Sequence, residues 1–205
     1  MRRLAAAAAE AGADIREHSR VESLDELDAD QVLIATDGYG RGLLPELDEA
    51  VWPARGQVVA TDPLAERLFE CPHYARQGFD YWQQLTDGRI VLGGFRDYSI
   101  MAELTDDEVT TPVIQEALTG FLRELVGYDP PIAYRWAGIF GLTQDMLPLV
   151  GRVPAHEGVW VAAGYSGHGN VLGLACGELV GAAILGREDS QLDLFEPARL
   201  LRLAG

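Results

Sequence analysis

Residues 158–185 read GVWVAAGYSGHGNVLGLACGELVGAAIL, and the rest of the chain is interpreted outward from this stretch. Residues 159–163 form a short apolar run that predicts a buried strand, and residues 171–185 predict a helix rich in small side chains. The loop between them consists of Gly164, Tyr165, Ser166, Gly167, His168, Gly169 and Asn170. A strand, a glycine-rich loop and a helix aim free main-chain N–H groups at an electron-rich ligand, which makes this loop a candidate cofactor site. The alternative is a tight strand-to-helix turn of the kind found in any α/β protein.

The segments near the two ends of the chain have an α/β pattern. Residues 4–11 predict an alanine-rich helix that stops at Gly12, residues 13–18 alternate like a strand, and residues 20–24 predict another short strand. Residues 31–36 predict a buried strand that runs into Asp37-Gly38-Tyr39-Gly40. At this strand end, Thr36 and Gly38 either let the main chain approach a ligand or form a simple glycine turn.

The centre of the chain has the pattern of an antiparallel sheet. Strands are predicted at residues 52–60, 79–85, 89–95 and 132–140, with a helix at 113–126 and an extended segment at 146–151. We therefore predict an α/β (α+β) fold in which an antiparallel-sheet domain at 51–142 is inserted into an α/β domain formed by residues 1–48 and 143–190. Residues 191–205 are expected to form a tail containing a short surface helix at 192–203.

The composition disfavours several classes of function. A formal net charge of -16 disfavours nucleic acid as a partner. Every basic residue is arginine, which excludes a Schiff-base lysine, attachment of pyridoxal phosphate and a P-loop lysine. The two cysteines and four histidines have no metal-ligand spacing, and Cys176 is expected to be a buried small residue. No apolar run is long enough to span a bilayer, and we expect a cytoplasmic protein.

Several motifs in a fixed order resemble one family. They are Thr36 after an apolar strand, Arg55-Gly56-Gln57, Gly93-Gly94, Arg135-Trp136-Ala137-Gly138, Thr143-x-Asp145-x-x-Pro148-x-x-Gly151 and Gly164-Tyr165-Ser166-Gly167-His168-Gly169. This order, running nearly from end to end, resembles the D-amino acid oxidase superfamily of FAD-dependent enzymes. Its nearest members are of the gamma-glutamylputrescine oxidase and glycine oxidase kinds.

One feature of that family has no counterpart in this sequence. Members of the family begin with a strand, a G-x-G-x-x-G turn and a helix that holds the ADP part of FAD, and this chain has no such motif. We interpret the chain as the C-terminal portion of such an enzyme, a truncated product or one half of a split enzyme. Its binding of FAD is then expected to be weak or lost.

The resemblance implies roles for individual residues. The loop from Gly164 to Asn170 is expected to face the pyrimidine end of the flavin, with Thr36 and Gly38 near the backbone of FAD. The sheet that carries Tyr81, Trp82 and Trp136 is expected to cover the substrate. Phe140 stands where amino-acid oxidases place an arginine that binds the substrate carboxylate, which favours an amine without an adjacent carboxylate. Arg55 and Arg96 are either binding groups for a remote acid or structural arginines, and His168 and Tyr165 are expected to be structural.

The resemblance implies that the substrate is a small amine or amino acid, oxidised at a C–N bond by hydride transfer to flavin, with no catalytic residue assigned. Without lysine, an acceptor other than oxygen is expected. A second hypothesis is a non-catalytic subunit or remnant that needs a partner chain, or self-association through an exposed sheet edge, to bind FAD. A third is an unrelated α/β protein whose glycine loop binds another anion.

Overall fold

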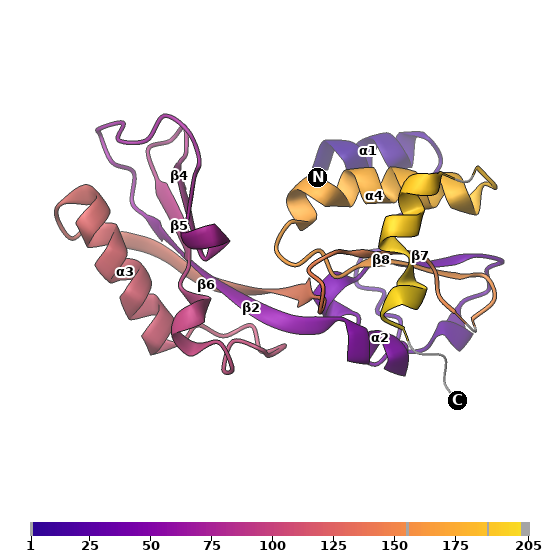
Figure 1. Cartoon of the computed structure of the whole chain (residues 1–205). Coiled ribbons are helices and arrows are strands. Elements are labelled where there is room, and N and C mark those ends of the chain that lie inside the picture. The colour runs from indigo at the N-terminus through magenta and orange to yellow at the C-terminus, as the bar shows by residue number, and fades with distance from the viewer. Residues whose placement is uncertain (1, 155, 188, 202–205) are drawn as a thin grey trace.

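The computed structural model describes residues 2–154, 156–187 and 189–201. Two separate sheets organise this part of the chain, one with three strands and one with five. Figure 1 shows them as two lobes joined by the long strands β2 (Trp52–Thr61) and β6 (Ile132–Leu142). The predicted fold class, mixed α/β with an antiparallel sheet, is confirmed.

The three-stranded sheet has the order β1-β8-β7, where β1 is Val32–Ile34, β8 is Val159–Ala163 and β7 is Leu149–Arg152. Strands β1 and β8 are parallel, and β7 and β8 are antiparallel. Side chains alternate across β8, so Val161 packs toward the short helix α2 (Pro45–Ala50) and Trp160 toward the long helix α4 (Gly169–Ile184). The central strand β8 is therefore covered on both faces, whereas Leu33 of the edge strand β1 is 39% exposed.

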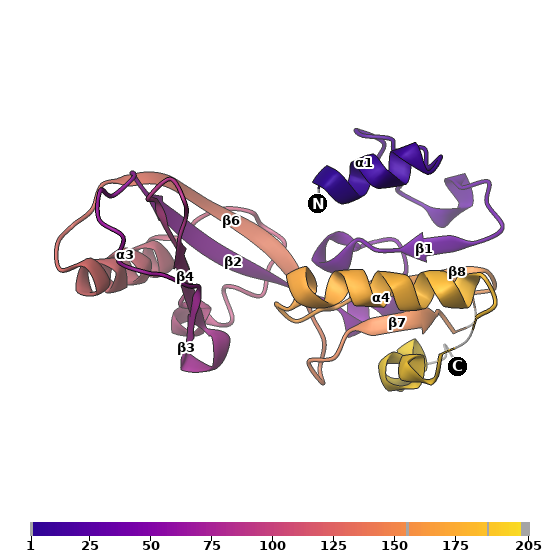
Figure 2. The same ribbon diagram turned by 90° about the horizontal axis from the view of Figure 1, so that it is seen from above.

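The five-stranded sheet has the order β3-β4-β5-β2-β6. Its other strands are β3 (His73–Ala75), β4 (Asp80–Gln84) and β5 (Ile90–Gly94). Helix α3 (Pro112–Val126) packs Ile114, Leu118 and Leu122 against Val59 and Leu92, which covers one face only. Among the described residues, no α-helix covers the opposite face, which we call the open face (Figure 2). Alternate residues of β2 and β6 lie on this face.

Local patterns predicted most of these elements. The predicted helices at 4–11, 113–126 and 171–185 correspond to α1 (Arg2–Glu10), α3 and α4, and the hairpin around Asp87-Gly88 joins β4 to β5. The strands predicted at 13–18 and 20–24 are wrong, because these residues are largely exposed and pair with no strand in the described part of the chain. The tail contains 3-10 turns at Ser190–Phe195 and Pro197–Arg199, and residues 202–203 of its predicted helix lie outside the described residues.

Candidate functional site

The loop that joins β8 to α4 turns by means of left-handed backbone conformations. Gly164, Ser166 and Gly167 have φ of 75°, 51° and 89°. A Cβ on Gly164 would lie 2.4 Å from Cγ2 of Thr143, so this position needs glycine for space as well as for conformation. The chain then enters α4 at Gly169, with no side chain capping the helix N-terminus.

The main-chain amides of the loop divide into two groups. The amides of Gly164 and Tyr165 donate to Oδ1 of Asp37 at 2.8 and 3.3 Å. Two others are also used within the protein, because Ser166 donates to the carbonyl of Gly141 at 2.8 Å and His168 to the carbonyl of Tyr165 at 2.9 Å. By contrast, the amides of Gly167, Gly169 and Asn170 have no acceptor among the described residues. The expectation that the whole loop offers bare amides is therefore wrong, and only its last part does so.

Exposure separates the loop residues in the same way. Gly167, His168 and Asn170 are exposed, whereas Ser166 is buried and its hydroxyl accepts a hydrogen bond from the Thr143 amide at 3.2 Å. Tyr165 packs beside the core formed by α4 and β8, and burial, together with the nearby Cys176, raises the pKa of its hydroxyl to about 12. The side chains of Tyr165 and Ser166 therefore support the loop from inside. Cys176 is buried, as expected.

Asp37 is the residue that the sequence reasoning missed. It opens a 3-10 turn, Asp37–Tyr39, directly after β1, with a left-handed φ of 49° that aspartate tolerates better than most residues. Its carboxylate also accepts a hydrogen bond from the Gly141 amide at 2.9 Å through Oδ2. Asp37 thus ties together the ends of β1, β6 and β8. An aspartate followed by glycine at the end of a buried strand was the signal for it.

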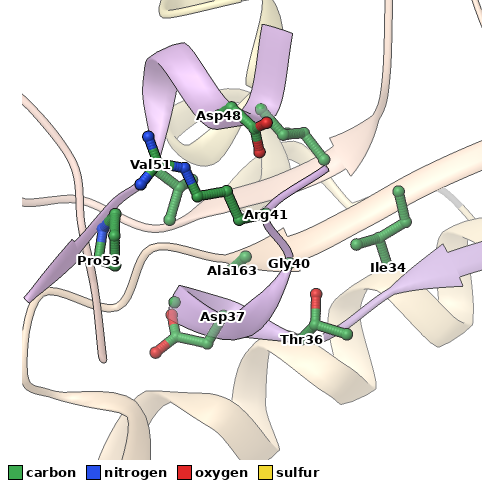
Figure 3. Close-up of a pocket in the computed structure, with 11 residues that line it drawn as sticks. Ile34, Thr36, Asp37, Gly40, Arg41, Asp48, Val51, Pro53 and Ala163 are labelled. Atoms are coloured by element: carbon green, nitrogen blue, oxygen red, sulfur yellow. The ribbon is translucent and has the colours of Figure 1, made fainter. Parts of the chain in front are cut away.

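Gly38 and Thr36 lie on either side of this residue. Gly38 is buried, and a Cβ on it would lie 2.6 Å from the carbonyl carbon of Phe140, so glycine here lets the two main chains pack directly against each other. Thr36 lines a cavity of about 20 Å³ at the ends of β1 and β8, together with Arg41 and Asp48 (Figure 3). That volume is room for one water molecule, and it cannot hold part of a nucleotide.

The open face of the five-stranded sheet brings the predicted substrate residues together. Tyr81, Gly93, Val58 and Trp136 follow one another across β4, β5, β2 and β6 in direct register. Tyr81, on β4, and Trp136, on the edge strand β6, are 39% and 42% exposed, so two large aromatic rings face solvent on the open face. Three strand spacings of about 4.8 Å each separate their main chains. Trp82 points the other way and packs against Phe121 under α3, so the expectation that it covers the substrate is wrong.

Phe140 lies where the open face meets the loop. A Cβ on Gly56 would be 3.5 Å from Cε1 of Phe140, and a Cβ on Gly167 would be 4.0 Å from its Cε2. The ring therefore spans from the floor of the open face to the part of the loop with unused amides. A Cβ on Gly138, which pairs with Gly56, meets nothing within 4 Å, so space remains beside Phe140 and Trp136.

Arg55 is on the covered face of the sheet and is 4% exposed. Its guanidinium makes a two-point ion pair with Glu103, through Nε at 2.9 Å and Nη2 at 2.9 Å, and also donates to the carbonyls of Ala102 and Asp107. Because its donors are used inside the protein, the hypothesis that Arg55 binds the substrate is wrong, and its structural alternative holds. Within residues 2–154, 156–187 and 189–201 there is no cluster of three metal-ligating side chains, and no helix has the length and apolarity to cross a membrane.

Comparison with known proteins defines the class to which this fold and site belong. Residues 1–183 match the family model described as "FAD dependent oxidoreductase" (DAO). The chain therefore belongs to the DAO family of FAD-dependent oxidoreductases.

Two curated relatives illustrate the similarity in sequence. The chain is 30% identical over 175 residues to gamma-glutamylputrescine oxidoreductase of Escherichia coli (strain K12), covering 82% of this chain and 39% of that protein. It is 29% identical over 171 residues to glycine oxidase of Pseudomonas aeruginosa, covering 81% of this chain and 44% of that protein. The chain thus spans about two fifths of the length of these relatives.

Solved structures share the fold. Glycine oxidase from Geobacillus kaustophilus superposes with a TM-score of 0.68 at 23% identity, covering 86% of this chain and 46% of that chain. L-proline dehydrogenase from P. horikoshii superposes with a TM-score of 0.68 at 21% identity, covering 82% of this chain and 46% of that chain. At this identity the comparison establishes the fold alone.

The residues at the loop fit one edge of an electron-rich ring. The unused amides of Gly167, Gly169 and Asn170 lie at the positive end of α4, whose first turn contains no acidic side chain. Gly167 brings no Cβ between these amides and a ligand, and its surroundings are open on that side. The described residues therefore suit the ring end of a flavin.

Proposed function

We propose that this chain forms the flavin-ring and substrate side of an FAD-dependent oxidoreductase that oxidises the C–N bond of a small amine or amino acid. The proposal rests on one observation: the ring of Phe140 lies between the open face and the part of the loop with unused amides, at the N-terminus of α4. We assign the ring-binding role to residues 1–48 with 143–190 and the substrate role to residues 51–142. Membership of the DAO family supports this assignment.

Each part of the site has a distinct role in this proposal. FAD, when bound, supplies the two-electron acceptor for a hydride from the carbon beside the amine nitrogen. The amides of Gly167, Gly169 and Asn170 would bind the ring edge and stabilise negative charge that develops there. Tyr81 and Trp136 would exclude water from the amine and orient it across the open face. Burial and Tyr74 raise the pKa of Tyr81 more than Arg96 lowers it, so this hydroxyl stays protonated at neutral pH and does not act as a base.

Phe140 favours a particular kind of substrate. A phenyl ring offers no hydrogen-bond donor, so nothing at this position would pair with a carboxylate on the reacting carbon. The same ring gives an apolar surface against which the methylene groups of an amine can pack. We therefore propose an amine without a carboxylate on the reacting carbon.

Flavin binding and reduction test the proposal. Purified protein is titrated with FAD while flavin fluorescence is followed, and the loaded protein is mixed with primary amines in the absence of oxygen. We expect saturable binding, followed by loss of the visible flavin absorbance with amines of the matching class. Saturable binding without reduction by any amine or amino acid would contradict the assigned reaction and leave the flavin site in place.

A second candidate function is that of a subunit that binds FAD only with a partner chain. The observation that favours it is the edge strand β1, where Leu33 is 39% exposed, together with the exposed Val171 and Leu174 of α4. A strand from another chain, or from a second copy, would continue the sheet there. Sedimentation of the protein with and without FAD distinguishes the two candidate functions, because this one requires that FAD binds only to an assembly. Leu33→Lys would then abolish both the assembly and FAD binding.

A further inference from the structure

Arg96 stands apart from the other arginines of the antiparallel sheet. It is half-buried and makes neither a hydrogen bond nor an ion pair with any residue between 2–154, 156–187 and 189–201. All the other arginines between residues 52 and 142 make at least one such bond: Arg55, Arg67, Arg76, Arg89, Arg123 and Arg135. In a chain with a net charge of -16, a guanidinium without a carboxylate partner is an available binding group.

Two aromatic rings hold this guanidinium in place. Its central carbon lies 5.0 Å from the ring centre of Phe79 and 5.7 Å from that of Phe140. Such stacking uses the faces of the guanidinium, whereas its N–H groups lie in its plane and stay available. The arrangement fixes the cation at little cost to its donors, which suits two-point binding of a carboxylate.

Neighbouring carboxylates do not neutralise this charge. Asp97 follows Arg96 in the chain, and Asp80 lies at the start of β4, but both carboxylates bind Arg76. The positive charge of Arg96 reaches the open face, where it acts to lower the pKa of Tyr81 against the larger effect of burial.

We propose that Arg96 binds a carboxylate that the substrate carries several atoms away from the amine to be oxidised. Arg96 lies over the ring of Phe140 and Gly167 lies beside the Cε2 edge of the same ring, so a substrate that reaches from the loop to Arg96 passes this one phenyl ring. The substrate class is then an ω-amino acid rather than an α-amino acid or a simple diamine. This inference rests on the proposed function, because it takes the open face as the substrate side.

Binding of matched probes tests the proposal. Calorimetric titration of the full chain compares 4-aminobutanoate and 6-aminohexanoate with butylamine and hexylamine, which have the same amine and no carboxylate. We expect one of the two acids to bind at least about tenfold more tightly than its matched amine, a preference of the size that a charged two-point hydrogen bond provides. Arg96→Met should remove this preference and leave binding of the amines unchanged, and Arg96→Lys should restore part of it.

Arg89→Met is the matched control. Arg89 also stacks on an aromatic ring of this sheet, with its guanidinium 5.3 Å from the ring centre of Tyr134, but it already pairs with Asp87. Its loss should leave the preference unchanged. The NMR signal of the Arg96 Nε–H group should shift with the acids and not with the amines. Equal preference in the wild type and in Arg96→Met overturns the proposal and leaves the amine site intact, whereas binding of none of the four probes overturns the substrate side of the proposed function as well.

Discussion

Asp37 holds Gly164 in place: its carboxylate Oδ1 accepts the Gly164 amide at 2.8 Å, although the two residues are 127 positions apart. The same carboxylate accepts the Gly141 amide at 2.9 Å. One side chain after β1 therefore sets where the glycine loop begins relative to the end of β6, and through it the distance between the loop and the open face.

Removing this carboxylate should destabilise the fold. In Asp37→Ala, the amides of Gly141 and Gly164 lose their acceptor in a partly buried position, and we expect the free energy of unfolding to fall by about 2 kcal/mol or more. Asp37→Asn keeps one acceptor oxygen and the tolerance for positive φ, so its loss should be smaller, roughly 1 kcal/mol. Urea unfolding measures both variants. Equal stability of Asp37→Ala and the wild type would show that the carboxylate does not organise the loop.

Asn170→Asp should increase the stability of the fold and weaken the binding of FAD. Asn170→Asp adds a negative charge in the first turn of α4, which has none, and should raise the free energy of unfolding by about 0.3 to 1 kcal/mol. The same charge should compete with an electron-rich ring at the unused amides and weaken FAD binding. Fluorescence titration with FAD and urea unfolding measure the two effects. As a control, Gly173→Ala lies one turn further along the helix in open space, and it should leave FAD binding unchanged. FAD affinity unaffected by Asn170→Asp would place the ring elsewhere.

The buried pair of Arg55 and Glu103 predicts how stability depends on pH. Burial alone would raise the pKa of Glu103, but hydrogen bonds from Arg55 and Gln57 outweigh it and lower the pKa below its ordinary value of 4.5. A carboxylate with a lowered pKa in the folded state stabilises the fold fully above pH 4.5, and this contribution is lost as pH falls through the folded pKa.

Glu103→Gln tests this dependence. At pH 7 it leaves the buried Arg55 without its counter-charge, and we expect a loss of about 3 kcal/mol in the free energy of unfolding. As pH falls from 4.5 through the lower folded pKa of Glu103, the difference from the wild type should narrow, because the unfolded chain takes up the proton first and protonated Glu103 no longer provides the counter-charge. Urea unfolding between pH 3.5 and pH 7 in steps of about half a unit measures it. Glu116→Gln, at an exposed position of α3, should change stability by less than about 0.5 kcal/mol, and a constant difference for Glu103→Gln at every pH would refute the assignment.

Two glycines of the same sheet should respond differently to substitution by leucine. A Cβ on Gly138 meets nothing within 4 Å, whereas a Cβ on Gly93 would lie 2.5 Å from the Tyr81 ring. Gly138→Leu should therefore fill the open face, raise KM for the amine several-fold and change stability by less than about 1 kcal/mol. Gly93→Leu should cost about 1 to 3 kcal/mol through overpacking. An unchanged KM in Gly138→Leu would mean that the substrate does not use this face.

Local chemistry explains which parts of the fold could be predicted from sequence. Alternating apolar residues bounded by Asp87-Gly88 predicted the β4–β5 hairpin, and the small-residue run after residue 170 predicted α4. Residues 13–18 alternate in the same way but do not pair with a strand in the described structure. Alternation of apolar and polar residues shows only that a segment is suited to form a strand. A strand also needs a neighbouring strand to pair with, and the pattern within one segment does not reveal whether there is one.

The site was harder to predict because its parts depend on long-range contacts. Tyr81, Trp136 and Phe140 share one face only through the register of β4, β5, β2 and β6, and Arg55 falls on the other face through the same register. A shift of one residue would have exchanged these roles. In the loop, the spacing of the glycines indicated where main-chain amides could lack an acceptor. Which amides do lack one depends on the hydrogen bonds that Asp37 and the carbonyl of Gly141 accept.

Strands β2 and β6 run from one core to the other as a continuous paired ribbon, from Trp52 opposite Leu142 to Thr61 opposite Ile132, and the register shifts only between Ala60 and Thr61, at the end far from the loop. Bending this connection would strain the hydrogen bonds that pair its two strands. If the open face is the substrate side, as proposed, the space above the reacting carbon depends on the sizes of a few side chains. On that proposal, we expect a bulkier amine to require a smaller side chain in place of Phe140 or Trp136.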